Sequence, residues 1–371
     1  MSYNMENSEI RVYDYVKKIG LKSFKRKKGN FFKKSIFKAG AAGNKSGAAE
    51  KTTKIKMYAP VFAALLTCVI LSVFPSRYAG AAADGLKLWA LVVLPSLLPF
   101  FFLTLLITAS GALAPLAKRL NPLTRFLYNA GGACGFIQLM SFISGYPVGA
   151  RLISELYSLN ALDEKTAAKA SAFCSTSGPA FVIGSVGAGM LSSPKAGAVI
   201  FACHILSAVF TGVIYRKYCD YQPIAPLFKN NGMKNPLAEC AYSTSVSCLT
   251  VGTLICFFYV VSTVASDFYL LYPLEFLLTL LFKNQNAAKG FCSGLLECTK
   301  GALELSRCEL GFFKLPLITF IITFGGISVI AQSLAFLKQA GVKSKFFITA
   351  KLIQAVISFA LCAVFQLIFA I

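Results

Sequence analysis

An apolar run is interrupted at its centre in Ala172-Phe-Cys-Ser-Thr-Ser-Gly-Pro-Ala-Phe-Val-Ile-Gly184. Glycine and proline weaken a helix by about 1 and about 3 kcal/mol, so the segment from Ser175 to Pro179 predicts a break in the helix. Backbone that leaves a helix at membrane depth is stable only where protein buries it or water reaches it, because hydrocarbon offers no hydrogen bonds. The break therefore predicts a polar cavity inside a membrane protein.

Three further segments are apolar on average yet rich in glycine, proline or polar side chains. They are residues 131–151, with five glycines and Pro147, residues 290–304, with three charged side chains, and residues 320–332, with a Gly-Gly pair. A polar hairpin candidate followed by a broken span therefore occurs at 131–191 and again at 290–337. Corresponding interruptions in two halves of a chain are typical of transporters built from repeats, whose site lies near the bilayer midplane.

Close packing of helices is the alternative explanation for these segments, because glycine and proline are common in membrane helices. Packing alone does not explain why polar residues stand beside every break. We therefore favour a transport site over a purely structural role for the interruptions.

The composition places the whole chain in the membrane class. Of its 371 residues, 56% are hydrophobic and 14% are charged, whereas an ordinary soluble domain is about 45 to 50% apolar. Apolar runs of about 18 residues or more, each long enough to cross a bilayer, recur along the chain. The clear ones lie at 57–74, 86–109, 196–215, 245–265, 268–282, 312–337 and 346–371. We expect an all-α polytopic protein with about eight spans and two re-entrant hairpin-like segments in a two-repeat architecture.

The domain organisation follows from the uneven charge. Residues 1–56 carry 15 basic and 4 acidic side chains, which predicts a disordered cytoplasmic tail under the positive-inside rule, with contact to anionic membrane lipids as the second possibility. Nucleic acid is not an expected partner. Residues 57–371 form the predicted membrane domain, with one repeat at about 85–215 and the other at about 245–340. Met57 is an alternative start of the protein.

The restarted helix after the first break is a predicted anion site. Pro179 suits the first helical position, and the hydroxyls of Ser175 and Ser177 can cap the helix. Its free N–H groups and partial positive charge then favour a carboxylate or a phosphate. Arg151 either adds a bidentate anion contact or anchors the end of the hairpin at the membrane interface.

Carboxylates in the second half suggest a coupling ion. An intramembrane carboxylate is a functional candidate, either for proton or sodium coupling or for pairing with Lys300. Glu297 and Glu304 are seven residues apart and share one face if their segment is a single helix. An amphipathic hairpin at the interface is the alternative. Ser328 and Gln332 offer neutral hydrogen bonds suited to a ring or an amide.

Few residues support enzyme or cofactor chemistry. The chain has one histidine, His204, in the middle of an apolar run, where we expect a packing role rather than a proton relay. Its twelve cysteines form no Cys-x-x-Cys pair, which predicts buried thiols and neither disulfides nor a metal site. No nucleophile elbow or P-loop occurs. We expect no enzymatic activity, no catalytic residue and no cofactor.

Four ordered blocks carry a family resemblance over about residues 85–340. They read Ser144-Gly-Tyr-Pro-Val-Gly-Ala-Arg151, Phe173-Cys-Ser-Thr-Ser-Gly-Pro179, Gly294-Leu-Leu-Glu-Cys-Thr-Lys-Gly301 and Phe324-Gly-Gly-Ile-Ser-Val-Ile-Ala-Gln332. These blocks resemble the Gate, or nucleoside-recognition, domain of membrane proteins, and specifically the YlbJ family of sporulation integral membrane proteins, also called SpoVV. The resemblance implies an endospore-forming bacterium, the outer forespore membrane, and movement of dipicolinic acid towards the forespore.

The predicted substrate-binding residues come from these blocks. They are Gly145, Tyr146, Pro147, Gly149, Arg151, Ser175, Thr176, Ser177 and Gly178 in one half-site, and Glu297, Thr299, Gly325, Gly326, Ser328 and Gln332 in the other. Dipicolinate, a planar pyridine with two carboxylates, suits an anion site of the kind predicted at the break. Two alternatives stay open, a nucleoside-type transporter and a membrane scaffold for spore envelope assembly that transports nothing.

Overall fold

The computed structural model describes residues 62, 65–110, 113–222 and 235–369. The chain divides into two compact units, Met1–Phe74 and Pro75–Ile371. In the first unit the described residues include a helix at Leu65–Val73. The predicted basic tail at 1–56 lies outside the described residues, as does the start of the predicted span at 57–74. The candidate site lies wholly in the second unit.

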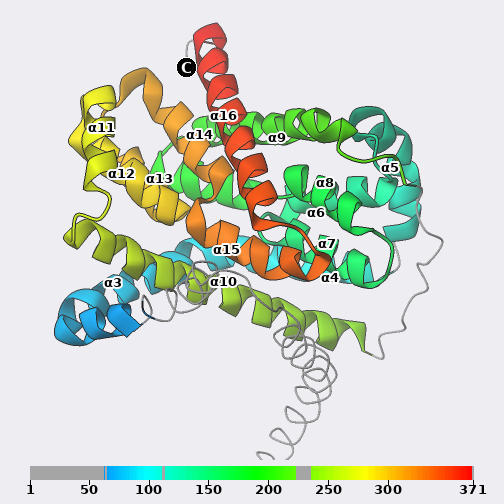
Figure 1. The fold of residues 1–371 in the computed structure, drawn as a ribbon, viewed down its shortest axis with the longest axis horizontal. Coiled ribbons are helices and arrows are strands. Elements are labelled where there is room, and N and C mark those ends of the chain that lie inside the picture. The colour runs from blue at the N-terminus through cyan, green and yellow to red at the C-terminus, as the bar shows by residue number, and fades with distance from the viewer. Residues whose placement is uncertain (1–61, 63–64, 111–112, 223–234, 370–371) are drawn as a thin grey trace, which may run out of the picture. The chain divides into compact units, whose positions relative to one another are not determined.

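Every regular element in the described part of the second unit is a helix (Figure 1), so the prediction of an all-α protein is confirmed. The helices are, in order, α3 (Pro75–Leu88), η1 (Trp89–Val93), α4 (Leu94–Ala109), α5 (Leu113–Tyr128), α6 (Gly132–Ser144), α7 (Val148–Ser158), α8 (Glu164–Phe173), η2 (Ala180–Met190), α9 (Pro194–Ile214), η3 (Tyr215–Lys217), α10 (Pro236–Asp267), α11 (Tyr272–Phe282), α12 (Gln285–Leu296), α13 (Cys298–Ser306), η4 (Gly311–Phe313), α14 (Lys314–Phe324), α15 (Gly326–Leu337), η5 (Lys338–Ala340) and α16 (Ser344–Phe369).

Side chains at the helix starts explain several of these boundaries. Asp163, Ser193, Asn235 and Asn284 each precede a helix and accept a hydrogen bond from the backbone N–H three residues further on. Such caps satisfy N–H groups that the helix itself leaves unpaired. Partial burial acts to raise the pKa of Asp163, but its hydrogen bonds, chiefly from Thr166, outweigh burial and hold that pKa below its usual value.

Four helical segments in the described chain are long and apolar enough to cross a membrane, or up to six if two bent helix pairs each form one span. The four are Pro194–Lys217, Pro236–Asp267, Gly311–Ala340 and Ser344–Ile368. The sequence-based span at 268–282 is shorter than predicted. Its helix, α11, has 11 residues, about 16 Å at 1.5 Å per residue, and does not cross a core about 30 Å thick.

The same order of elements occurs twice in the second unit. A helical hairpin, α6 with α7, is followed by the interrupted pair α8 and η2 and then by the continuous helix α9. Later, the hairpin of α12 and α13 is followed by the interrupted pair α14 and α15 and then by the continuous helix α16. The two continuous helices, α9 and α16, pack against each other in the centre of the unit (Figure 1).

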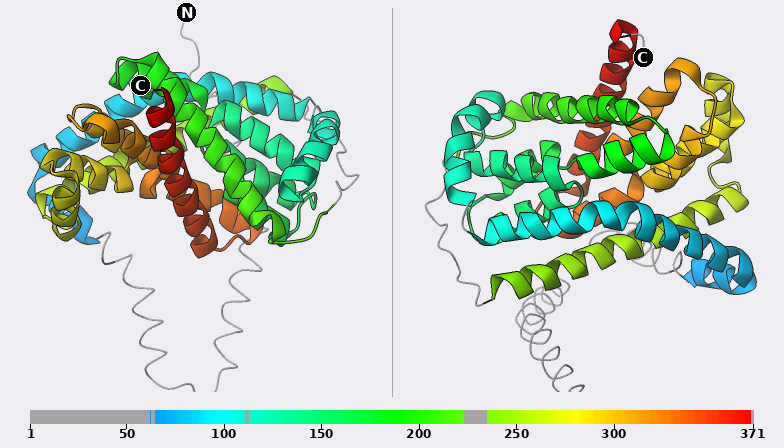
Figure 2. Two further views of the ribbon diagram at one scale, coloured as in Figure 1. Left: turned by 90° about the horizontal axis from the view of Figure 1, so that it is seen from above. Right: turned by 180° about the vertical axis from the view of Figure 1, so that it is seen from behind.

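A long helical segment lies along one side of the two series of helices described above. Helices α3, η1 and α4 follow one another without a gap, and α10 packs along α3 and α4 (Figure 2). The helix continues through Pro95 and Pro99, and its irregular part is the π-helical turn η1 at Trp89–Val93. A π-helical turn accommodates one extra residue without ending the helix.

The distribution of polar and apolar side chains is that of a protein in lipid. Large apolar side chains on outward faces, such as Leu91, Phe276 and Leu281, are mostly exposed. The interior, by contrast, contains many hydroxyl and amide groups and several charged side chains, including Glu297, with 1% of its surface exposed. In a bilayer, apolar surface costs nothing outside, while polar groups must find partners inside.

One buried lysine joins two helix ends. Lys169 of α8 is fully buried, and its ammonium group donates hydrogen bonds to the backbone oxygens of Tyr128 and Asn129, after α5, and of Arg216 and Cys219, after α9. The carbonyls at a helix C-terminus lack partners within the helix and attract a cation. Lys169 therefore stabilises the junction of three elements.

Replacement of this lysine tests its structural role. Lys169→Met leaves four carbonyls without their buried cation and is expected to reduce the free energy of unfolding by about 2 to 4 kcal/mol. Thermal unfolding of the purified protein in detergent measures the change, and Lys169→Arg, which keeps the charge, is the control. Equal stability of the Met variant and the native protein would contradict this role.

Candidate functional site

Four interruptions of helical structure define the candidate site. The first hairpin turns at residues 145–147, between α6 and α7, and the second turns at Glu297, between α12 and α13. The first interrupted pair opens at residues 174–178, and the second opens at Gly325. Two of these breaks lie in the first series of elements and two in the second.

Within each half, the hairpin break lies directly against the break of the interrupted pair. Gly145 has a φ of +80°, and a Cβ atom there would lie 2.5 Å from the backbone nitrogen of Gly178. In the other half, Gly326 has a φ of +67°, and its Cβ would lie 2.8 Å from the carbonyl oxygen of Gly294 in α12. Only glycine combines this backbone conformation with so close an approach.

The breaks of both halves border one cavity. It has about 430 Å³ of space free of protein atoms, a figure that includes the open space at its mouth. Three of the four breaks supply wall residues, and α15, which follows the break at Gly325, supplies Val329 and Gln332. Leu97, Phe181, Val251 and other apolar side chains complete the wall. The polar or backbone-exposing residues that line it are Tyr146, Ser177, Gly178, Glu297, Thr299 and Gln332.

A chain of hydrogen bonds links the two halves beside this cavity. Tyr146 Oη donates to the carbonyl oxygen of Thr323 at 3.0 Å, across the gap between the first hairpin and α14. His204 of α9 accepts from the backbone N–H of Ser177 at Nε2, at 2.9 Å, and its Nδ1 lies 2.8 Å from Thr323 Oγ1. Because a backbone N–H can only donate, the neutral ring carries its proton on Nδ1 and donates it to Thr323.

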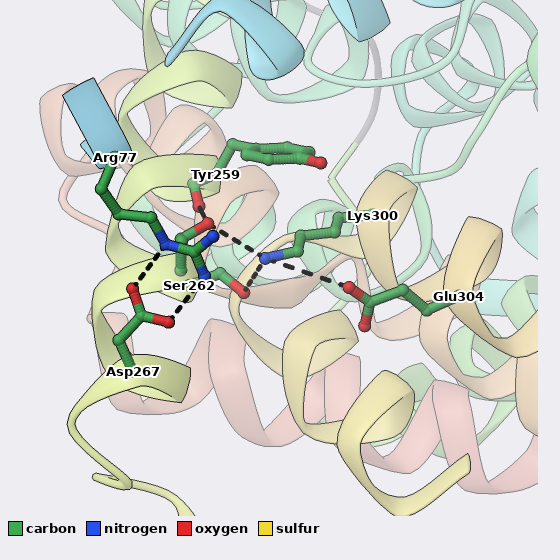
Figure 3. Close-up of polar contacts among 7 residues, drawn as sticks. Arg77, Tyr259, Ser262, Asp267, Lys300 and Glu304 are labelled. Carbon is green, nitrogen blue, oxygen red and sulfur yellow. Dashed lines mark hydrogen bonds and ion pairs between the residues drawn. The ribbon is translucent and has the colours of Figure 1, made fainter. Parts of the chain in front are cut away.

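The carboxylate of Glu297 has a structural task in addition to lining the cavity. Its Oε2 accepts a hydrogen bond of 2.7 Å from the backbone N–H of Lys300 and so caps α13. The Lys300 side chain points elsewhere (Figure 3), donating to the hydroxyls of Ser262 and Thr263 on α10. Its nearest carboxylate, Glu304 Oε1, is 4.0 Å away.

The Lys300 cluster links α13 to α10 through hydrogen bonds and lies outside the wall of the cavity. The Lys300 ammonium is 4.7 Å from the ring centre of Tyr259, and Arg77 of α3 forms two hydrogen bonds, of 3.0 and 2.8 Å, with the carboxylate of Asp267 nearby (Figure 3). These contacts fasten α10 to its neighbours, and the Arg77 pair contributes little because it is exposed to solvent.

Comparison with known proteins supports the family resemblance. The chain is 27% identical over 322 residues to the sporulation integral membrane protein YlbJ of Bacillus subtilis (strain 168), covering 80% of this chain and 79% of that protein. The chain is therefore similar to YlbJ over most of the length of both proteins. No protein-family model matches the chain, and no solved structure matches it. With its apolar spans, this chain is a multi-pass integral membrane protein.

The structure of this YlbJ-like protein places several predicted site residues away from the cavity. Arg151 lies in a second, separate crevice with Pro147, where its Nη1 donates to Ser247 Oγ at 2.7 Å. Thr176 turns its hydroxyl to Ser141 of α6, at 2.9 Å. Gly149, Gly325, Gly326 and Ser328 are packing or turn positions, and Gln332 donates to Ser328 at 3.3 Å.

Two local predictions are wrong. No side chain caps η2, which restarts after Pro179 as a π-helix, so Ser175 and Ser177 do not act as its N-cap. Glu297 and Glu304 do not share a helix face, because α13 begins only at Cys298. In both cases the extended backbone of the break changes the side-chain directions that a continuous helix would give.

Sequence analysis overlooked Lys351 of α16, which reaches the break of the first half. This lysine is fully buried, and its ammonium donates to Tyr146 Oη and to the carbonyl oxygen of Ser175. The available signal was a lysine inside an otherwise apolar span, since an ionisable residue at membrane depth is a functional candidate by default.

Among the described residues, no group of three or more His, Cys, Asp or Glu is placed to hold a metal ion. Of the cysteines, Cys134, Cys174, Cys203, Cys248 and Cys362 are buried, Cys256 is half-buried and Cys68 is exposed. The thiols in the second unit therefore mostly act as small apolar side chains.

A glycine substitution tests the contact of the breaks. Gly145→Ala places a methyl group against Gly178 in a left-handed backbone conformation, and we expect a loss of about 1 to 3 kcal/mol in stability together with loss of solute binding. The control is Gly184→Ala in η2, where no atom lies within 4 Å of the added Cβ. Thermal unfolding and ligand binding of the two purified variants measure the difference. Equal behaviour of the two variants would refute the close contact.

Proposed function

We propose that this protein transports an anionic aromatic dicarboxylate, dipicolinate, across the outer forespore membrane of a sporulating bacterium, without enzymatic activity. One observation carries the proposal, namely that helix breaks of both halves border a single cavity with polar residues in its wall. Exposed backbone at membrane depth is stable only in such a setting. The B. subtilis relative is named as a sporulation integral membrane protein, which supports the cellular setting.

The proposed architecture is a two-repeat transporter in which each hairpin re-enters the membrane and meets its interrupted span. The repeated order of hairpin, interrupted pair and continuous helix supports this architecture. In transporters of this kind the solute binds where broken helices meet, and one part of the protein moves against the other to alternate access. The solute would lie between Ser177 and Gly178 on one side and Glu297 and Thr299 on the other.

Glu297 bears on the coupling ion in this proposal. The carboxylate lies in the wall of the cavity, so a bound dianion opposes its negative charge and favours its protonated form. Entry of the solute is therefore accompanied by uptake of a proton at Glu297. This argument favours proton coupling over sodium coupling.

Uptake into proteoliposomes tests the transported solute. Purified protein should accumulate dipicolinate, and unlabelled dipicolinate should compete while uridine does not. Uptake of uridine that dipicolinate fails to inhibit would instead support a nucleoside transporter. Transport of neither solute, together with normal dipicolinate loading of spores after gene deletion in a sporulating host, would leave the scaffold alternative.

The pH dependence of uptake tests the coupling ion. Native uptake should rise as the pH falls and should not require sodium, because protonation of Glu297 removes the opposing charge. Glu297→Gln keeps an oxygen acceptor for the cap of α13 but carries no charge, so its uptake should lose this pH dependence. Glu304→Gln, outside the cavity, is the matched control and should retain the native profile. A sodium requirement would contradict proton coupling.

A further inference from the structure

Lys351 is a buried cation held only by neutral groups. Its ammonium donates three hydrogen bonds, to Tyr146 Oη at 2.8 Å, to the Ser175 carbonyl oxygen at 2.9 Å and to Gln354 Oε1 at 2.8 Å. The ammonium also lies 5.0 Å from the ring centre of Tyr146. Lysine has three donors and no acceptor, so these bonds use its full capacity. The three partners come from the first hairpin, the first interrupted pair and α16 itself.

The charge of Lys351 has no internal counterpart. In the described chain, Arg77, Lys87 and Lys300 form ion pairs with carboxylates, whereas Lys351 forms none. Burial of an ammonium group without an opposite charge is costly, even where neutral oxygens accept its hydrogen bonds. A negatively charged ligand near Lys351 would lower this cost.

Two residues that hold Lys351 have side-chain polar atoms left without partners. Within the described residues, the hydroxyl of Ser175 and the amide nitrogen of Gln354 are buried and make no hydrogen bond. Because the oxygen of Gln354 accepts from Lys351, its NH₂ group must point the other way and remains free to donate. Buried polar atoms are nearly always satisfied in folded proteins, so an unsatisfied pair beside a buried cation indicates a missing ligand.

This cluster adjoins the wall of the cavity. Tyr146 lines the cavity and contacts Lys351 through its hydroxyl. Ser175 precedes Ser177 and Gly178, which line the cavity, in the same extended segment. We propose that Lys351, Ser175 and Gln354 form a subsite that binds one carboxylate group of the transported solute. The inference rests on the proposed transport function and names the side of the cavity that recognises negative charge.

The chemistry of the subsite matches a carboxylate. The Ser175 hydroxyl and the Gln354 amide each offer a hydrogen-bond donor, and the ammonium of Lys351 supplies the charge. Arg151, the cation that the sequence favoured for this task, is occupied in the separate crevice with Ser247. A solute with two carboxylates would place one at this subsite and leave the other in the main cavity.

Lys169 shows how a purely structural buried lysine differs. It is equally buried, but it donates only to backbone carbonyls at helix ends and lies outside the cavity wall. Neither Tyr128 nor Cys219, two of the residues that hold it, has an unsatisfied buried side-chain atom among the described residues. Lys169 is therefore a matched control for removal of a buried ammonium group.

The test compares acids with their neutral amides on purified full-length protein. Two pairs of probes are used, dipicolinate with pyridine-2,6-dicarboxamide and benzoate with benzamide, and both affinity and thermal stabilisation are measured. The native protein should prefer the acid of each pair. Lys351→Met should weaken binding of the acids by about 10- to 100-fold and change binding of the amides by about twofold or less. Lys169→Met should lower thermal stability and keep the preference for acids.

A second variant keeps the test decisive if the Met variant does not fold. Gln354→Glu places a carboxylate beside Lys351, which satisfies the ammonium internally and should abolish the preference for acids in a folded protein. Retention of that preference in Gln354→Glu, or in a folded Lys351→Met, would overturn the subsite, as would a native protein that binds no acid better than its amide.

The outcomes separate the subsite from the transported solute. A native protein that prefers benzoate through Lys351 but does not bind dipicolinate would support the subsite and refute dipicolinate as the solute. Dipicolinate uptake that is equal in native protein and Lys351→Met would support the proposed function and refute the subsite.

Discussion

The need to satisfy backbone polar groups away from water governs this structure. Each helix break at membrane depth releases N–H and C=O groups that hydrocarbon cannot pair. The protein meets this need by placing each hairpin break against the break of an interrupted pair, at Gly145 with Gly178 and at Gly326 with α12. Glycine at these contacts lets the backbones approach, and the remaining space becomes a polar cavity shared by both halves.

Charge and hydrogen bonding follow from the same constraint. His204 satisfies the backbone N–H of Ser177 and links it to Thr323, so the only histidine in the sequence joins the two interrupted pairs. Glu297 caps the helix that follows its break, and its carboxylate stands in the cavity wall. Lys351 adds hydrogen bonds to Tyr146 Oη and to the carbonyl oxygen of Ser175 at the breaks of the first half. A solute that carries negative charge fits a cavity where an uncompensated cation lies beside one wall and a protonatable acid forms another.

The sequence predicted the breaks because glycine, proline and hydroxyl residues are poor helix formers, and it predicted the helical class because long apolar runs have few other solutions in lipid. It did not predict which side chains meet. Arg151 lies one turn into α7, and its side chain contacts Ser247 of α10. Thr176 lies in the first interrupted pair, and its hydroxyl contacts Ser141 of α6. Lys351 lies 176 residues from Ser175, so their contact depends on the packing of α16 against the centre of the unit, which no local pattern encodes.

The central claim is that helix breaks of both halves border one solute site, and a structure of the purified protein with dipicolinate, determined by electron cryo-microscopy, tests it most directly. The account predicts solute density between the Ser177–Gly178 and Glu297–Thr299 segments, with a carboxylate directed towards Lys351. Continuous, tightly packed helices at these four positions, or solute bound elsewhere, would contradict it.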